Sequence, residues 1–295
     1  MSLAKLHNTP AGRVFDVFNA IILGIIGLLT VVPFMYILAG SFATESELTR
    51  RSFFIFPEEF SLSAYQYIFS TDTFIRSLTV SIGVTTVGTI LCLFFTFSMA
   101  YPLSRKVLVG LNFFLNMVIF SMLFGGGMIP TYLVVRNLGL LDTYWALMLP
   151  LAINPFNLII VKTFFQGIPI ELEESAKIDG ATEFDVFWRI MLPLSKPILA
   201  TFALFYAVAI WNDFFSALLY IKDSAKWPVQ VLLQNIIILA QGLAADPSLA
   251  GEMVEPPDQS LKLAVVVVAT IPILVVYPFL QKHFAKGMLI GSVKG

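Results

Sequence analysis

The chain has 295 residues, of which 58% are hydrophobic and only 13% are charged, and its mean hydropathy is +0.85. This share of charge is about half that of a soluble domain, so the polar surface is too small to cover a soluble core and suits a bilayer. The net charge of −1 gives no basis for binding nucleic acid, and a single cysteine, Cys92, excludes a disulfide framework or a thiolate metal site within the chain. The N-terminus leads into an apolar run without a small-residue cleavage site, which indicates a retained first helix and not a signal peptide.

Six apolar segments are long enough to cross a membrane, which takes about 20 helical residues each. They cover residues 14–39, 78–103, 111–135, 144–165, 198–220 and 263–280. The sequence therefore predicts an all-α membrane protein with six transmembrane helices.

Basic residues predict the orientation of these helices. With the N-terminus in the cytoplasm, eleven of the 18 lysine and arginine residues fall inside and seven fall outside. Cytoplasmic segments carry the basic excess in membrane proteins, so both termini are expected to be cytoplasmic. The long connections 40–77 and 221–262 would then lie outside, either as plain connectors or as contacts for an external partner. Aromatic residues in the first one have a spacing that suits an interfacial helix. They are Tyr65, Tyr67, Phe69 and Phe74.

Glycine and proline interrupt several of the predicted helices. They are Gly125, Gly126, Gly127 and Pro130 in the third, Pro150 and Pro155 in the fourth, and Pro272 and Pro278 in the sixth. Such breaks release backbone groups, which inside a membrane must find partners in protein or in a watery cavity. The breaks therefore indicate either an internal pathway or ordinary kinks in packed helices.

Segment 167–197, between the fourth and fifth predicted helices, is the longest polar stretch on the predicted cytoplasmic side. Its local pattern predicts two short helices joined by a tight turn. Pro169 suits the first position of the first helix, and Gly180 suits a left-handed cap at its end. Thr182 can cap the second helix, with Asp185 in a loose capping-box position.

The second of these short helices, which Pro193 is expected to end, carries an apolar stripe. Phe184, Phe187, Trp188 and Met191 recur at spacings of three and four residues. A large exposed apolar patch usually marks an interface, so the stripe is expected either to dock on a partner or to pack beneath the helix ends of its own bundle.

The same segment resembles the EAA loop of ABC importer permeases. The matching residues are Glu174-Ser175-Ala176, Asp179-Gly180-Ala181 and Ile190-Met191-Leu192-Pro193, with Ser175 where the family commonly has alanine. Stretches 100–105, 211–215 and 286–295 are similar to the carbohydrate-uptake group of that family. One departure precedes the second predicted helix, where the chain has Arg76 and many relatives have asparagine.

The resemblance implies the MetI-like fold of type I ABC importer permeases, and a membrane-spanning subunit that imports a carbohydrate, especially an oligosaccharide. It also implies a second, homologous permease chain, usually a different one, together with two ATP-binding subunits, an extracytoplasmic solute-binding protein and surrounding membrane lipid. In this family the loop docks on the ATP-binding subunit. The residues that the resemblance places in this contact are Glu174, Ala176, Asp179, Gly180, Phe184, Phe187, Ile190, Leu192 and Pro193.

The implied organisation has three parts in an inner-membrane protein. Residues 1–77 form a cytoplasmic tail, the first transmembrane helix and an external segment. Residues 78–282 form the permease core with the coupling loop 167–197, and residues 283–295 form a cytoplasmic tail.

Two groups of polar residues are candidates for the translocation path. Asp213 is the only acidic residue well inside a predicted helix, and an intramembrane charge usually faces a cavity or a partner. With its neighbours Trp211 and Asn212 it offers an aromatic face, an amide and a carboxylate, which suit sugar rings and hydroxyls. Asn154 and Asn157, three residues apart, would share one helix face. Each group has the alternative of stabilising the packing between helices.

Motifs of other functions are absent from the sequence. It has no Gly-x-x-x-x-Gly-Lys-Ser/Thr phosphate loop and no Gly-x-Ser-x-Gly, and its two histidines are His7 and His283. We therefore expect no catalytic activity, no metal and no cofactor in this chain, with ATP and magnesium bound by partner subunits. The alternatives are an ion-coupled secondary transporter, which usually has several buried ionisable groups and internal repeats, and a non-transporting scaffold.

Overall fold

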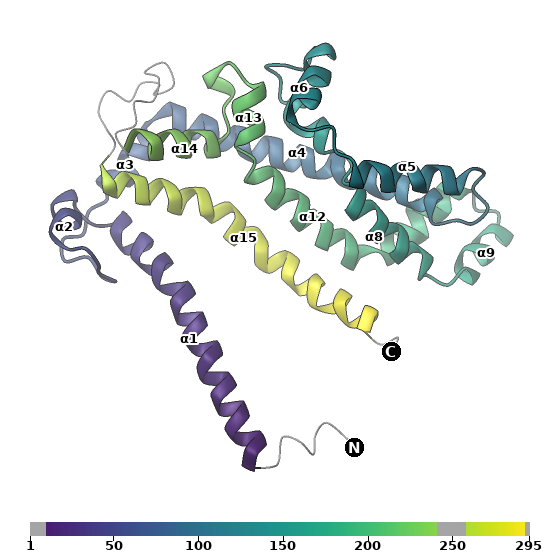
Figure 1. Cartoon of the computed structure of the whole chain (residues 1–295), viewed down its shortest axis with the longest axis horizontal. Coiled ribbons are helices and arrows are strands. Elements are labelled where there is room, and N and C mark those ends of the chain that lie inside the picture. The colour runs from purple at the N-terminus through teal and green to yellow at the C-terminus, as the bar shows by residue number, and fades with distance from the viewer. Residues whose placement is uncertain (1–9, 241–257, 293–295) are drawn as a thin grey trace.

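The structure is a computed structural model that describes residues 10–240 and 258–292. The start of the predicted N-terminal tail, part of the second long connection and the last three residues lie outside the described residues. Within the described ranges the chain is helical and has no β-strand, apart from an isolated bridge between Ala43 and Phe60. Figure 1 shows long helices running alongside one another with short helices at both ends, which confirms the all-α prediction.

The elements are α1 (Pro10–Ser41), α2 (Glu45–Arg50), α3 (Ser63–Ser70), α4 (Asp72–Leu103), α5 (Leu111–Leu123), α6 (Met128–Asn137), α7 (Trp145–Met148), the 3₁₀ turn η2 (Leu149–Leu151), α8 (Pro155–Gln166), α9 (Glu171–Ile178), α10 (Glu183–Asp185), the π-helical turn η3 (Val186–Met191), α11 (Leu192–Leu194), α12 (Lys196–Trp211), α13 (Phe215–Tyr220), the 3₁₀ turn η4 (Ser224–Lys226), α14 (Val229–Ala240) and α15 (Gln259–Ser292). Helices α1, α4 and α15 are long and apolar enough to cross a membrane. Three bent helix pairs raise the number of candidate spans in the described part to six.

Three of the predicted spans are broken, the third and fourth at the glycines and prolines that interrupt them in the sequence, and the fifth where the sequence predicted no break. Helices α5 and α6 meet at 118°, because Gly127 has a φ of +80° that a right-handed helix cannot contain. The α7–η2 segment and α8 meet at 51°, where Pro155 starts a new helix. The fifth predicted helix divides into α12, which ends at Trp211, and α13, which begins at Phe215.

Helix α4 is the centre of the bundle and packs against α12, α8, α7 and α14 (Figure 1). A Cβ atom added at Gly88 would lie 2.9 Å from Ile210 Cδ1, so α4 and α12 approach too closely for a larger residue. In lipid, where no hydrophobic effect joins helices, such close contact is a main source of association. The hydroxyls of Thr96 and Tyr206 add a buried hydrogen bond of 2.7 Å between the same two helices.

Helix α1 leaves this bundle. Figure 1 shows it splayed away from the other long helices and approaching α15 only toward its C-terminal end. None of its most apolar stretch is buried, whereas Ala39 and Ser41 at its end are. An apolar helix exposed along most of its length needs lipid or another chain around it.

Part of the expected interfacial helix in the first connection is α3. It contains Tyr65, Tyr67 and Phe69, and the hydroxyl of Tyr65 lies 2.7 Å from Ser41 Oγ at the end of α1. Phe74 belongs instead to the first turn of α4, where it is buried. The four aromatic residues that we assigned to one interfacial helix therefore belong to two helices, which are separated at Thr71.

At the same end of the bundle, Asp142 joins the loop before α7 to the loop after α13. Its Oδ1 accepts hydrogen bonds from the backbone N–H groups of Lys222 and Asp223, both at 3.1 Å, and its Oδ2 accepts one from Lys226 Nζ at 2.8 Å. The Lys226 hydrogen bond, together with these backbone donors, lowers the pKa of Asp142. The charged carboxylate thus holds the two loops together.

Replacing Asp142 with asparagine is expected to lower the melting temperature of the purified protein at pH 7 by roughly 2–4 °C. Asparagine tolerates the positive φ of 60° at this position, so the variant removes the charge and not the backbone conformation. A group whose pKa is lowered by folding stabilises the protein above its unfolded pKa of about 3.9, and loses this effect as the pH falls through the folded pKa. The difference from wild type should therefore disappear in acid. The matched change at exposed Asp258 should leave the melting temperature at pH 7 unchanged. Equal melting of Asp142→Asn and wild type at pH 7 would contradict the role of Asp142 in joining the two loops.

Candidate coupling site and translocation path

The turn between α9 and α10 has the geometry that the sequence predicts. Gly180 has a φ of +87°, the left-handed conformation that glycine adopts without strain. The N–H of Ala181 donates to the carbonyl of Ala176 at 2.9 Å, and the N–H of Gly180 donates to that of Lys177 at 3.1 Å. These two hydrogen bonds form a Schellman motif, which ends α9 and turns the chain sharply.

The second short helix begins as predicted but continues further. Thr182 Oγ1 accepts from the N–H of Asp185, and Asp185 Oδ2 accepts from the N–H of Thr182, both at 3.2 Å, so the capping box is complete. The helix then passes through the π-helical turn η3 and ends at Leu194, not at Pro193. Because the π-helical turn shifts the hydrogen-bond register, Pro193 falls in a first-turn position where its missing donor is tolerated. The chain bends by 79° before α12.

The predicted apolar stripe is divided between the core and the surface. Phe187 and Met191 are buried, and Phe187 packs against the ring of Tyr101 with centroids 5.3 Å apart. Phe184 is 71% exposed and Trp188 is 44% exposed. The single-stripe prediction was wrong because a π-helical turn has more residues per turn than the α-helix that the spacing assumed.

An exposed apolar and acidic surface remains at this end of the bundle. We call it the coupling surface, and it consists of Glu174, Ile178, Asp179, Phe184 and Trp188. Ile178 is 86% exposed, and the rings of Phe184 and Trp188 lie 5.9 Å apart. Of the other residues that the resemblance places in the ATPase contact, Gly180 and Pro193 are exposed, Ala176, Ile190 and Leu192 are half-buried, and Phe187 is buried.

Next to this surface in the sequence, an ionic cluster joins α9 and α10 to the end of α4. Glu173 is 5% exposed, and its Oε2 lies 2.7 Å from Arg105 Nη2 in an ion pair without hydrogen-bond geometry. Its Oε1 accepts a hydrogen bond of 2.9 Å from Lys177 Nζ, which also lies 2.6 Å from Glu183 Oε1. The Tyr101 hydroxyl donates to Glu183 Oε2 at 2.9 Å.

The contacts of the cluster favour the charged forms of Glu183 and Lys177. The hydrogen bond from Lys177 lowers the pKa of Glu183. The hydrogen bonds from Lys177 to Glu183 and to Glu173 in turn raise the pKa of Lys177, and the bond to Glu183 has the larger effect. This cluster was not predicted from the sequence. The pairing of Glu173 with Lys177 was readable as an i,i+4 pair, but Arg105 is distant in the chain and no local pattern connects it to α9.

The candidate path residues near position 213 lie at a helix break and not inside a continuous helix. The Asn212 side chain donates to the carbonyl of Val208 at 2.9 Å and so caps the end of α12. Asp213 Oδ1 accepts from the N–H of Ser216 at 3.1 Å, at the start of α13. Trp211 is buried, and its Nε1 has no hydrogen-bond partner among the described residues. The prediction of an acid within a continuous helix was therefore wrong, since these polar groups satisfy the backbone where the helix breaks.

Trp211 and Asp213 line one small cavity with residues of α4, α7 and α12. Trp211 also lines a second, apolar cavity of about 120 Å³ between α4, α12 and α15. Asn154 and Asn157 line neither of these two cavities. Asn154 is the N-cap of α8, and its side-chain oxygen accepts a hydrogen bond of 3.1 Å from the N–H of Asn157, so this oxygen is engaged by the backbone at the start of the helix.

Comparison with known proteins decides the family. Residues 4–290 match the family model of the "Binding-protein-dependent transport system inner membrane component". This chain belongs to that family. The permease is 68% identical to Protein LplC of Bacillus subtilis over 98% of both chains. It is 56% identical to the polygalacturonan/rhamnogalacturonan transport system permease protein YtcP of the same organism, over 96% of this chain and 99% of the relative.

A solved structure has the same fold. The permease superposes with a TM-score of 0.85 on a chain of a bacterial ABC transporter involved in the import of the acidic polysaccharide alginate. The two chains are 33% identical, and the match covers 94% of the permease and 98% of the solved chain. The expected ABC importer permease fold is thereby confirmed.

Proposed function

We propose that this permease is the membrane-spanning subunit through which an ATP-driven, binding-protein-dependent importer takes up an oligosaccharide. The proposal is carried by similarity along the whole chain to permeases whose names or descriptions specify carbohydrate import. The exposed coupling surface supports it independently, because an apolar and acidic surface at the end of a membrane bundle needs a soluble partner.

The partner at the coupling surface is a separate ATP-binding subunit, which holds the ATP and magnesium. The sequence of the permease has no phosphate loop, so ATP hydrolysis requires another chain. A second permease chain, of related but different sequence, would cover α1 and complete the translocation path. An extracytoplasmic binding protein would deliver the sugar to the opposite end of the bundle.

The coupling surface then lies in the cytoplasm, with both termini on the same side. The excess of basic residues in the segments on that side supports this orientation. Helix α4 begins at the outer end and finishes at the ionic cluster, so its 32 residues connect the two ends over about 48 Å.

In this arrangement the coupling surface, the ionic cluster and the helix breaks each have a different role in transport. The coupling surface would receive the closing movement of the ATPase pair, and the ionic cluster would pass it to α4. The broken helices at residues 124–127 and 212–214 allow the bundle to rearrange in discrete segments, because a helix break can take up a change in backbone angles. Trp211 and Asp213, which share a cavity at the second break, remain candidates for contact with the substrate.

The test is uptake by the complete complex, reconstituted in vesicles with its sister permease, ATPase subunits and binding protein. Labelled oligosaccharide should accumulate only when ATP is supplied on the side of the vesicle membrane that carries the ATPase subunits. Vanadate on that side should stop uptake, whereas ionophores that collapse ion gradients should not. The two alternatives have different outcomes. Uptake driven by an ion gradient without ATPase subunits would indicate a secondary transporter, and a complex that transports no oligosaccharide would favour a scaffold.

A further inference from the structure

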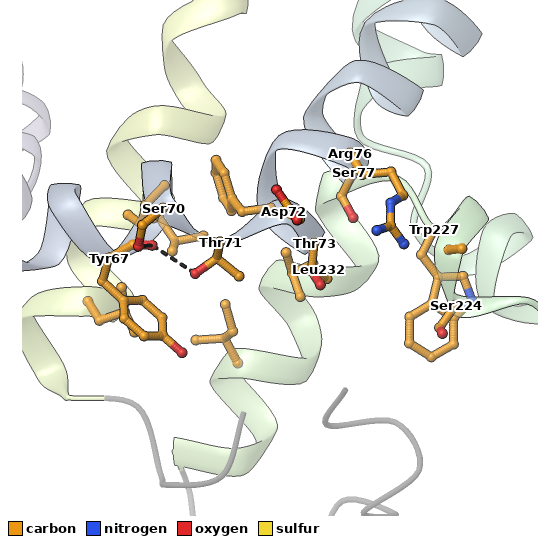
Figure 2. Close-up of a pocket in the computed structure, with 16 residues that line it drawn as sticks. Tyr67, Ser70, Thr71, Asp72, Thr73, Arg76, Ser77, Ser224, Trp227 and Leu232 are labelled. Atoms are coloured by element: carbon orange, nitrogen blue, oxygen red, sulfur yellow. Dashed lines mark hydrogen bonds between the residues drawn. The ribbon is translucent and has the colours of Figure 1, made fainter. Parts of the chain in front are cut away.

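A cavity of about 460 Å³ lies at the end of the bundle opposite the coupling surface. It is enclosed by the junction of α3 and α4, by η4, and by the facing sides of α14 and α15, as Figure 2 shows. Its volume is in the range of small-molecule binding sites, about 300–1,000 Å³. None of the candidate path residues that we predicted from the sequence lines it.

The lining of the cavity suits a carbohydrate. Hydroxyl groups come from Ser70, Thr71, Thr73, Ser77 and Ser224, and aromatic rings come from Tyr67, Phe74 and Trp227. The hydroxyls of Thr73 and Ser224 make no hydrogen bond within the described residues, so they are available to a ligand. Sugars present apolar ring faces and many hydroxyls, which match aromatic surfaces and small polar side chains respectively.

Arg76 is the only cationic side chain in this lining. Figure 2 shows its guanidinium pointing into the space between Thr73 and Trp227. It is exposed and forms no ion pair with any described residue, including Asp72, the one acidic residue of the lining, which is four positions earlier in α4. A guanidinium with free donors binds carboxylates through two parallel hydrogen bonds, which a neutral sugar cannot match.

We propose that this cavity is an outer subsite for an acidic oligosaccharide, and that Arg76 is a specificity-determining residue that binds a sugar carboxylate. The inference rests on the proposed function and on its orientation, which places the cavity on the side where substrate arrives. Asp72 contributes to the selection, since it repels an anionic group placed away from Arg76 and so restricts the carboxylate to one position. The permease thus distinguishes charged from neutral sugars before they reach the helix breaks.

The proposal predicts a selective loss of binding in Arg76→Gln. The probes are trigalacturonate and its carboxyl-reduced, neutral counterpart, titrated onto the assembled permease pair and ATPase subunits, without the binding protein, in nanodiscs of zwitterionic lipid and followed by saturation-transfer NMR. The dissociation constant for trigalacturonate should rise about tenfold, which corresponds to about 1.4 kcal/mol, and that for the neutral trisaccharide should not change. Arg76→Lys, which keeps the charge, should lose less. Arg136→Gln, at an exposed arginine of α6, should bind both sugars like wild type.

Several outcomes would overturn the inference. Equal weakening of both sugars would make Arg76 a structural residue, and unchanged binding of trigalacturonate would remove its role altogether. Selectivity that appears only when anionic lipid is added would assign Arg76 to a lipid phosphate. Wild-type complex that takes up the neutral trisaccharide with ATP but does not bind the acidic one would overturn this inference and leave the proposed function intact. If the wild-type complex showed no ATP-dependent uptake of any oligosaccharide, the proposed function itself would be wrong.

Discussion

Replacing Gly180 with valine is expected to reduce ATP-driven uptake by at least tenfold while the protein still assembles in the membrane. At a φ of +87°, an L-residue is disfavoured by about 1–2 kcal/mol, and a β-branched one by more. A Cβ atom at this position would meet no other atom within 4 Å, so the effect comes from the backbone and not from a clash. The turn must then open, which moves α9 relative to α10 and divides the coupling surface between two misplaced helices.

The measurements are sugar uptake and ATPase activity with and without loaded binding protein, in the reconstituted complex. In Gly180→Val, the binding protein should no longer stimulate ATP hydrolysis. Asparagine tolerates positive φ, so Gly180→Asn should keep most of the coupling. Gly139 has a φ of +69° in the loop at the far end, so Gly139→Val introduces similar strain without touching the coupling surface. It should lower stability but keep the ratio of sugar transported to ATP hydrolysed. Full uptake and normal stimulation in Gly180→Val would show that this turn does not position a docking surface.

Replacing Glu173 with glutamine is expected to be more damaging to both stability and coupling than the same change at its neighbour Glu174. Glu173 is buried against Arg105, and removing one partner of a buried ion pair costs about 3–5 kcal/mol because the other charge stays behind. Its loss would also free Lys177 from one of its two carboxylate partners. Helix α9 would then be held to α4 mainly by apolar contacts, and movement at the coupling surface would reach α4 only weakly.

The adjacent pair gives a matched control. Glu174→Gln removes an exposed carboxylate, so it should weaken ATPase binding without lowering the melting temperature of the purified permease. Glu173→Gln should lower that temperature and reduce uptake about tenfold or more, because a weakened contact between α9 and α4 would lose more than about 1.4 kcal/mol of coupling. A double-mutant cycle with Arg105→Gln separates the pair from its surroundings. Additive effects of the two substitutions, or wild-type melting of Glu173→Gln, would contradict the proposed link.

Local chemistry made one part of the site predictable. The same local structure forms wherever a glycine is followed by a capping threonine and by an aspartate three residues after the threonine, because the hydrogen bonds of these residues stay within one turn. Gly180, Thr182 and Asp185 accordingly behave in the structure as their types predict. The prediction that Phe184 to Met191 form one apolar stripe was wrong, because it used the residue spacing of an α-helix for a stretch that is π-helical.

Asp213 illustrates the opposite limit. Hydropathy is averaged over a window of residues, and residues 198–220 are apolar enough for one helix. In the structure, however, the helix ends at Trp211, with Asn212 as its C-cap. Whether a polar residue in such a window ends a helix depends on which neighbouring backbone groups need partners. Here Asn212 and Asp213 each bond to a backbone group at the break, which only the folded chain reveals.

The sequence by itself determined that this chain is a membrane protein, that it is helical and where the turn between α9 and α10 lies, because hydropathy and capping act over short stretches of chain. The tertiary structure alone decided which charges are buried together and where the cavity around Arg76 forms. The pairing of Arg105 with Glu173, and the assembly of the cavity around Arg76 from α3, α4, η4, α14 and α15, join segments that are distant in sequence. Such contacts are set by how the helices pack, and no local pattern encodes them.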